Sequence, residues 1–237
     1  MPKDVIPLLK LAALALSPIF ICAIYIFIRD KYEKEPVKLL FTGVLYGAFI
    51  TAPIVHTQNF VTLFIPNAGW LMETFYLTFI VAALVEEGYK FLLLFFLVWR
   101  NRNFNERFDG IVYGAFISLG FAGIENVLYV FNPELGGVET GLMRAVFSVP
   151  GHAIFGIMMG YYFALMKFEP QRRFRLLLLA YFVPWALHGT FNFILMSSMS
   201  YMMVLFVLFT GYLWVVSFRK MKTHIENSPF KPIAPSK

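Results

Sequence analysis

Apolar residues are grouped into long stretches that follow one another along nearly the whole chain of 237 residues. A helix of about 20 apolar residues crosses the hydrocarbon core of a bilayer, and a segment surrounded by lipid satisfies its backbone hydrogen bonds only as a helix. The pattern therefore predicts an all-α protein, a polytopic bundle of about seven to eight transmembrane helices. Residues 1–222 form this single transmembrane domain, and residues 223–237 form a tail. The expected spans are residues 6–28, 38–58, 70–98, 109–131, 143–166, 174–196 and 199–218.

The composition agrees with a membrane protein. Hydrophobic residues make up 59% of the chain and charged residues only 14%, whereas soluble domains carry about 25% charged residues. The first stretch follows Lys3 as in a signal peptide, but no small-residue cleavage site follows Phe27, so we expect a retained helix. Cys22 is the only cysteine, so neither a disulfide framework nor a cysteine nucleophile is expected.

Lysine and arginine residues are concentrated in alternate loops. They follow the first, third, fifth and seventh expected spans, whereas the loop after the second span has none. The positive-inside rule therefore predicts that these loops and the tail, residues 223–237, are cytoplasmic and that the N terminus lies outside. These basic residues also explain the net charge of +6, because they set the topology and contact anionic lipid headgroups. We therefore expect no nucleic-acid partner.

Ionisable and amide side chains interrupt four of the apolar stretches. Such groups are costly at membrane depth, so by default they indicate function. Residues four apart share a helix face, which places Glu86 with Lys90 and His188 with Asn192. Counted at about 1.5 Å per residue from the outer helix ends, the groups lie between the outer half and the middle of the membrane, in a site that opens outward. The residues concerned, all within 84–193, are Glu86, Glu87, Lys90, Glu125, Asn126, His152, His188 and Asn192.

Small residues recur along two of these spans. Gly110 and Gly114 are four apart on the fourth span, and Gly156 and Gly160 are four apart on the fifth. Such spacing lets helices approach closely. We expect this close approach to bring the polar faces of the spans together.

The polar side chains are of the types that peptide hydrolysis uses. The reaction needs a base to activate water, donors to stabilise the oxyanion, and a proton for the leaving amine. Either Glu86 or Glu87 is the candidate base. Lys90, one turn away, either holds one of the pair ionised or neutralises a structural carboxylate. The sequence leaves both choices open.

Two schemes for activating the water are open. In the first, His152, His188 and Glu125 ligate a zinc ion that keeps one position free, as hydrolytic zinc sites do. In the second, no metal takes part: a glutamate and His152 activate the water, and His188 with Asn192 forms the oxyanion hole. A His-Glu-x-x-His string, which would decide for zinc, is absent from the sequence.

Four strings on four consecutive spans resemble the motifs of the PrsW family of intramembrane proteases, in the family's order. They are Glu-Glu-Gly-Tyr-Lys at 86–90, the segment 109–129, Pro-Gly-His at 150–152 and His-Gly-Thr-Phe-Asn-Phe at 188–193. Ser118 departs from the pattern, where we expect glycine. A more distant similarity connects the chain to type II CAAX prenyl endopeptidases, which share a Glu-Glu motif and a final His-x-x-x-Asn.

The resemblance to the PrsW family implies a membrane-embedded protease in the bacterial plasma membrane. Proteases of this family are usually classed as metallopeptidases, whereas the related prenyl endopeptidases support the metal-free scheme. The best-known role in the family is the first cut in a membrane-tethered anti-sigma factor, which serves envelope-stress signalling. The resemblance therefore implies an anti-sigma factor as the substrate and the lipid bilayer as the setting.

Two other function classes fit part of the pattern. A proton-coupled transporter also places Glu, His and Lys within helices, but it favours an inverted repeat with broken helices, and Pro150 and Pro184 do not belong to a convincing repeat. A non-catalytic scaffold subunit, of the kind found in gamma-secretase, is the second alternative. Retention of both glutamates and both motif histidines argues against a scaffold.

Structural roles are the competing interpretation for single residues. His152 and His188 can form hydrogen bonds between helices. Asp109, at the start of the fourth span, is expected to cap the helix. His56 and His224 are expected to face solvent or the membrane interface.

Overall fold

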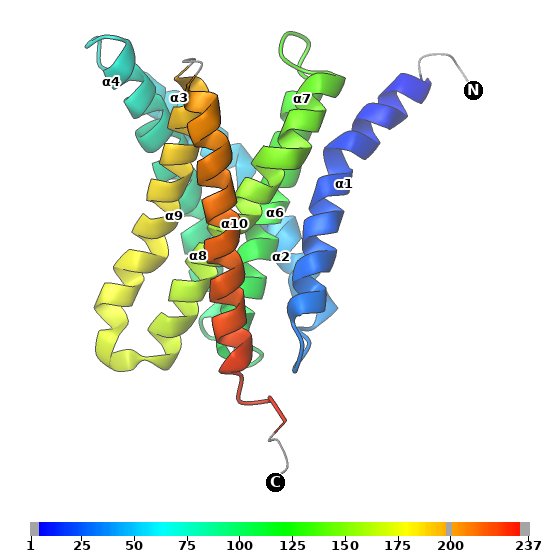
Figure 1. Ribbon diagram of the computed structural model, residues 1–237, viewed down its shortest axis with the longest axis vertical. Helices are drawn as coiled ribbons and strands as arrows, with labels where there is room; N and C mark the ends of the chain where they lie inside the picture. Colours follow the sequence, from blue (N-terminus) through cyan, green and yellow to red (C-terminus); the bar gives the residue numbers. More distant parts are fainter. Residues whose placement is uncertain (1–4, 198–200, 233–237) are drawn as a thin grey trace.

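The computed structural model describes residues 5–197 and 201–232, and within these ranges every regular element is a helix. The predicted all-α bundle is therefore confirmed (Figure 1). In chain order the elements are α1 (Val5–Arg29), α2 (Val37–Phe49), α3 (Thr51–Thr62), α4 (Trp70–Phe75), η1 (Tyr76–Leu84), α5 (Val85–Val98), α6 (Arg107–Val130), α7 (Val138–Met143), η2 (Arg144–Ser148), α8 (Val149–Phe168), η3 (Pro170–Arg172), α9 (Arg173–Met196) and α10 (Met202–Glu226).

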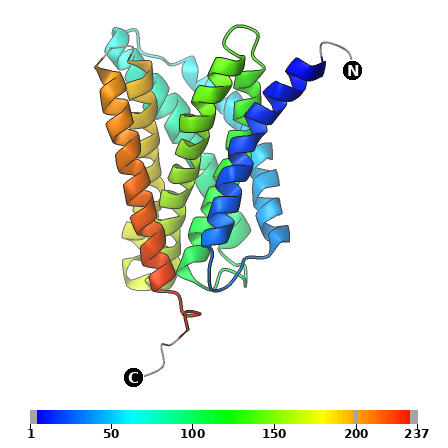
Figure 2. The same ribbon diagram turned by 45° about the vertical axis from the view of Figure 1, so that its right-hand side comes forward.

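Within the described ranges, six helices are long and apolar enough to cross a membrane by length and composition. The remaining expected span is the unbroken helical run α4–η1–α5, which carries four residues of the types Asp, Glu, Lys and Arg, three of them buried inside the bundle. Counting this run as a crossing gives an odd number of spans. That agrees with α1 beginning at one end of the bundle and α10 finishing at the opposite end (Figure 2). The six helices are Leu8–Arg29, Val37–Thr62, Arg107–Val130, Val138–Phe168, Pro170–Met196 and Met202–Glu226.

Helices α6 and α8 form the centre of the bundle. Within their membrane-crossing stretches 72% and 61% of the residues are buried, against 22–28% for the other four crossing helices. The predicted glycine ladders meet here: a Cβ on Gly114 would lie 2.5 Å from the carbonyl oxygen of Gly156, and one on Gly110 would lie 2.6 Å from that of Gly160. Only glycine fits such an approach, so the two spans pack backbone to backbone.

Helix α6 begins with a capping box. Glu106 is the N-cap residue, and the Oδ2 atom of Asp109 accepts hydrogen bonds from the backbone N–H groups of Asn105 (2.9 Å) and Glu106 (2.7 Å). The prediction that Asp109 caps this helix is therefore right in kind, although its position is N3 and the N-cap lies three residues earlier.

The last helix extends past the boundary that we placed at residue 222. Because α10 ends at Glu226, the first four residues of the predicted tail are helical. Residues 233–237 of the tail, Lys3, and the start of the expected span 199–218 lie outside the described residues. The cytoplasmic location of the tail stays a prediction.

Candidate active site

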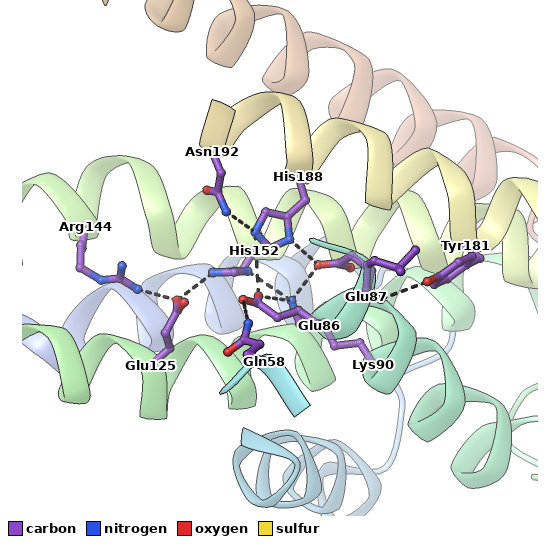
Figure 3. Close-up of polar contacts among 11 residues, drawn as sticks. Gln58, Glu86, Glu87, Lys90, Glu125, Arg144, His152, Tyr181, His188 and Asn192 are labelled. Carbon is purple, nitrogen blue, oxygen red and sulfur yellow. Dashed lines mark hydrogen bonds and ion pairs between the residues drawn. The ribbon is translucent and has the colours of Figure 1, made fainter. Parts of the chain in front are cut away.

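The polar side chains predicted on separate spans lie together inside the bundle (Figure 3). Glu86 and Glu87 come from the first turn of α5, His152 from the first turn of α8, and His188 from the middle of α9. One ligand-type atom from each of the four residues lies within 4.8 Å of the others. All four side chains are buried, with His152, the most exposed, at 5%. The structure thus brings the two glutamates and the two motif histidines into one cluster.

Two π-helical segments lead directly into this cluster. Segment η1 precedes the glutamates, and η2 precedes the first turn of α8. A π-helical turn holds more residues than an α-helical turn, so it rotates the faces of the downstream helix, and such turns are frequent at functional sites. Side chains of α9 satisfy carbonyl groups of η1: the indole of Trp185 donates to Phe79 O (2.8 Å), and the hydroxyl of Tyr181 donates to Leu84 O (3.0 Å).

Glu87 is held from two sides. Its Oε1 atom accepts hydrogen bonds from Nζ of Lys90 (2.8 Å) and from Nδ1 of His188 (2.9 Å). The carboxylate only accepts, so Nδ1 of His188 carries a hydrogen, and Nε2 then accepts a hydrogen bond from Nδ2 of Asn192 (3.0 Å). This pairing fixes the tautomer and the ring orientation of His188.

Glu86 has different surroundings. Its Oε1 atom accepts a hydrogen bond from Nε2 of Gln58 (3.0 Å), whereas its Oε2 atom is buried without a hydrogen-bond partner. That oxygen lies 3.6 Å from Nζ of Lys90 and 3.9 Å from Nε2 of His188. The Oε2 atom is thus available to accept a proton or to bind a cation. Gln58 was not among the predicted residues.

Glu125 lies beside His152 and outside the cluster of four. Its Oε2 atom is 2.6 Å from Nη2 of Arg144 and 2.9 Å from Nε2 of His152, while Nδ1 of His152 lies 3.3 Å from Nζ of Lys90. In this position Glu125 orients the imidazole of His152. Arg144, near the start of the expected span 143–166, was not among the predicted site residues.

Asn126 connects the site to the first helix. Its Nδ2 atom donates to the carbonyl oxygen of Ala15 (2.7 Å) on α1, and its Oδ1 atom accepts a hydrogen bond from Nε of Arg144 (2.9 Å). Asn126 is completely buried. Asn126 therefore holds Arg144 in place, and neither of its two hydrogen bonds goes to a residue of the cluster of four.

A cavity of about 530 Å³ lies against the cluster. Glu86, Glu125, His152, His188 and Asn192 line it, but Glu87 and Lys90 do not. Its other walls come from α3, η1, η2 and the last turns of α6 and α9. These helix segments lie toward the end of the bundle where α1 begins (Figure 1), so the cavity is off-centre in that direction.

The donor set fits a divalent metal ion such as zinc. Imidazole nitrogens and carboxylate oxygens are the ligands of hydrolytic zinc sites. Glu86 and Glu87 each keep one buried oxygen without a hydrogen-bond partner, and a buried acceptor in this state is explained by an ion, a proton or water. The residues able to hold the ion are His152, His188 and one of the two glutamates, while Lys90 counters part of the negative charge.

The fold and the cluster define a class of protein: a multi-pass membrane protein in which side chains of the types that catalyse hydrolysis are buried between the helices. A family described as "PrsW family intramembrane metalloprotease" matches residues 35–218. The chain is 37% identical over 223 residues to a protein named Protease PrsW from Clostridioides difficile (strain 630), covering 93% of each. It is 36% identical over 201 residues to Protease PrsW from Bacillus subtilis (strain 168), covering 84% of this chain and 88% of the relative.

No solved structure matches the chain. The chain belongs to the PrsW family of intramembrane metalloproteases. The resemblance inferred from the four motifs is confirmed, and with it the predicted class of enzyme, a membrane-embedded protease. The transporter and scaffold alternatives gain no support from these relatives.

Proposed function

We propose that the chain hydrolyses peptide bonds of membrane-tethered proteins in the 530 Å³ cavity, with Glu86 as the general base. The observation that supports this assignment is the difference between the two glutamates. Glu86 lines the cavity, whereas Glu87 does not. Each glutamate keeps an unpartnered Oε2 atom, but Oε1 of Glu87 is bound by Lys90 and His188, whereas Oε1 of Glu86 accepts only from the neutral amide of Gln58.

The remaining residues position the reaction. Glu87 orients the ring of His188, and Glu125 with Arg144 orients His152. Asn192 lines the cavity and has amide hydrogens that can donate to a developing oxyanion.

A metal ion, as the word metalloprotease in the family description implies, would be held by His152, His188 and Glu87, and Glu86 would remain free to activate the water. Such an ion supplies Lewis-acid polarisation of the scissile carbonyl. We propose that this ion is zinc, because imidazole and carboxylate are its usual ligands in hydrolytic sites.

We further propose that the substrate is a membrane-anchored anti-sigma factor, cut first by this enzyme in envelope-stress signalling. The support is the motif resemblance together with the position of the cavity. If the N terminus lies outside the plasma membrane, as the basic loops predict, the cavity lies toward the extracytoplasmic side. A first cut near the outer surface fits that location.

The test uses the full-length protein in liposomes with single-span substrates, including anti-sigma factors, and measures cleavage and metal content on the same samples. Glu86→Gln is expected to abolish cleavage while the metal is retained, whereas His152→Ala and His188→Ala are expected to lose both. Glu73→Gln, a change on the same helical run that does not line the cavity, is the matched control. Full activity of Glu86→Gln would refute the assignment of the base.

A deletion strain tests the signalling role separately. Unchanged processing of every membrane-anchored regulator in that strain would refute the anti-sigma role and leave the protease assignment intact. Cleavage by wild-type protein that contains no metal would select the metal-free scheme of glutamate and His152.

A further inference from the structure

A second cavity of about 380 Å³ lies at the opposite end of the bundle from the first. It forms where α6 begins, α8 ends, α9 begins and α10 ends (Figure 1). Arg107, Arg172 and Arg175 line it together with one acid, Glu169, whose Oε1 atom lies 3.4 Å from Nη2 of Arg107. The lining therefore carries more positive than negative charge, and it shares no residue with the lining of the active-site cavity.

His224 distinguishes this cavity from an ordinary basic rim. We expected this residue to face solvent or the interface, and that expectation is wrong: its side chain is 1% exposed, and its ring stacks on Tyr161 with centroids 4.1 Å apart. Its Nε2 atom lies 3.2 Å from the backbone carbonyl of Tyr161. A carbonyl only accepts, so Nε2 carries a hydrogen. The Nδ1 atom is buried and has no hydrogen-bond partner.

The unpartnered Nδ1 atom of His224 indicates which chemical group a ligand in this cavity would supply. In a neutral imidazole with its hydrogen on Nε2, Nδ1 is an acceptor. A buried acceptor needs a donor such as a hydroxyl. The three arginines are donors, and they favour an anion because a guanidinium group can donate two hydrogen bonds to the oxygens of one phosphate. The cavity thus offers donors to an anion and an acceptor to a neighbouring hydroxyl.

We propose that this cavity binds a phosphate group that carries a hydroxyl. Two sources have this chemistry: the phosphoglycerol headgroup of an anionic lipid, and free phosphate. The arginines would hold the phosphate oxygens, and the hydroxyl would donate to Nδ1 of His224. Leu165, Leu176 and Leu179 add an apolar wall beside the charged groups, as a lipid would require. Basic pockets between transmembrane helices are known to bind anionic headgroups.

The first experiment measures binding by full-length protein in nanodiscs of phosphatidylcholine to which phosphatidylglycerol is added, using retained lipid in native mass spectrometry. Arg172→Gln with Arg175→Gln is expected to weaken retention of phosphatidylglycerol by about tenfold or more. The matched control is Arg100→Gln with Arg102→Gln, two exposed arginines outside the cavity, which should leave retention unchanged. An equal loss in both pairs would indicate general surface charge and overturn the proposal.

The second experiment tests the hydroxyl. Phosphatidylmethanol has a phosphodiester but no hydroxyl, so wild-type protein should prefer phosphatidylglycerol to it. His224→Phe keeps an aromatic ring against Tyr161 and removes the acceptor, and it should lose this preference while still binding both lipids. The thermal unfolding midpoint of the variant verifies that it folds.

Inorganic phosphate in the low millimolar range identifies the source of the group. If phosphate displaces the lipid and stabilises the protein in phosphatidylcholine alone, free phosphate is the ligand. If phosphate has no effect and phosphatidylglycerol binds, the ligand is the lipid. Binding of neither, or equal retention of phosphatidylglycerol and phosphatidylcholine by the wild type, would refute the site.

Discussion

Lys90 is completely buried, and its side chain contacts both glutamates of the site. Its ammonium lies 2.8 Å from Oε1 of Glu87 and 3.6 Å from Oε2 of Glu86, and it lies 4.3 Å from the centre of the Phe121 ring. Replacing it by methionine keeps most of the side-chain volume and removes the charge. Glu87, which is also 0% exposed, then loses a hydrogen bond and its nearest cation.

The expected cost is large, because removing one partner leaves an uncompensated charge in the interior. Breaking a buried pair in this way costs about 3–5 kcal/mol, which lowers the folded-to-unfolded ratio by a factor on the order of 10²–10⁴. The double variant Lys90→Met with Glu87→Gln removes both charges, so it should recover a good part of this loss. His188 would still have an acceptor in the glutamine amide.

The assay is reversible unfolding in mixed micelles, with Lys222→Met as the matched control. Lys222 also pairs with a glutamate four residues away, at 3.6 Å from Glu226, but both side chains are more than half exposed. An exposed pair contributes at most about 1 kcal/mol. If Lys90→Met costs no more than Lys222→Met, or if the double variant is less stable than the single one, the buried ion pair does not stabilise the fold as we argue.

Three further predictions concern packing, pH and positioning. Gly114→Ala places a Cβ 2.5 Å from a carbonyl oxygen of α8 and should lower the unfolding free energy by about 1–3 kcal/mol, whereas Gly211→Ala, where a Cβ meets nothing within 4 Å, should not. Burial raises the pKa of Glu35 to about 7, so the folded state binds this proton more tightly than the unfolded state, whose pKa is near 4.3. The contribution of Glu35 to stability should therefore be greatest below about pH 4 and be lost as the pH rises through about 7, and Glu35→Gln should flatten the dependence of the thermal midpoint on pH over this range. Arg144→Gln removes the ion pair with Glu125 and should lower kcat about tenfold with metal content unchanged; restored kcat in Arg144→Lys would support the positioning role, and an unchanged kcat in Arg144→Gln would contradict it.

Hydropathy predicted the helices and most of the candidate site, because lipid penalises ionisable groups so strongly. Glu86, Glu87, His152 and His188 stand out in apolar stretches, and the close packing of α6 and α8 follows from glycines four residues apart. These features depend only on local sequence and on the bilayer as a solvent.

Three kinds of detail could not be predicted: the rotation of a helix, the packing of helices far apart in the sequence, and the residue at which a helix ends. A regular α-helix period does not apply across η1, so the sequence could not tell which of the two glutamates faces the cavity. Gln58 lies 28 residues before Glu86, and only the packing of α3 beside α5 brings their side chains to 3.0 Å. His224 was placed in the tail because the apolar pattern fades there, yet α10 continues and buries it against Tyr161.

The charge of the site gives a reason for its composition. Three carboxylates, Glu86, Glu87 and Glu125, face two cations, Lys90 and Arg144. When all three carboxylates are ionised and the histidines are neutral, one negative charge is uncompensated. At this depth an unbalanced charge is costly, and a divalent cation would reverse its sign. The resulting positive charge would lie beside the cavity, where the oxyanion of peptide hydrolysis develops. The excess of carboxylate thus favours binding of a divalent cation, and the positive charge of that cation would in turn favour the reaction.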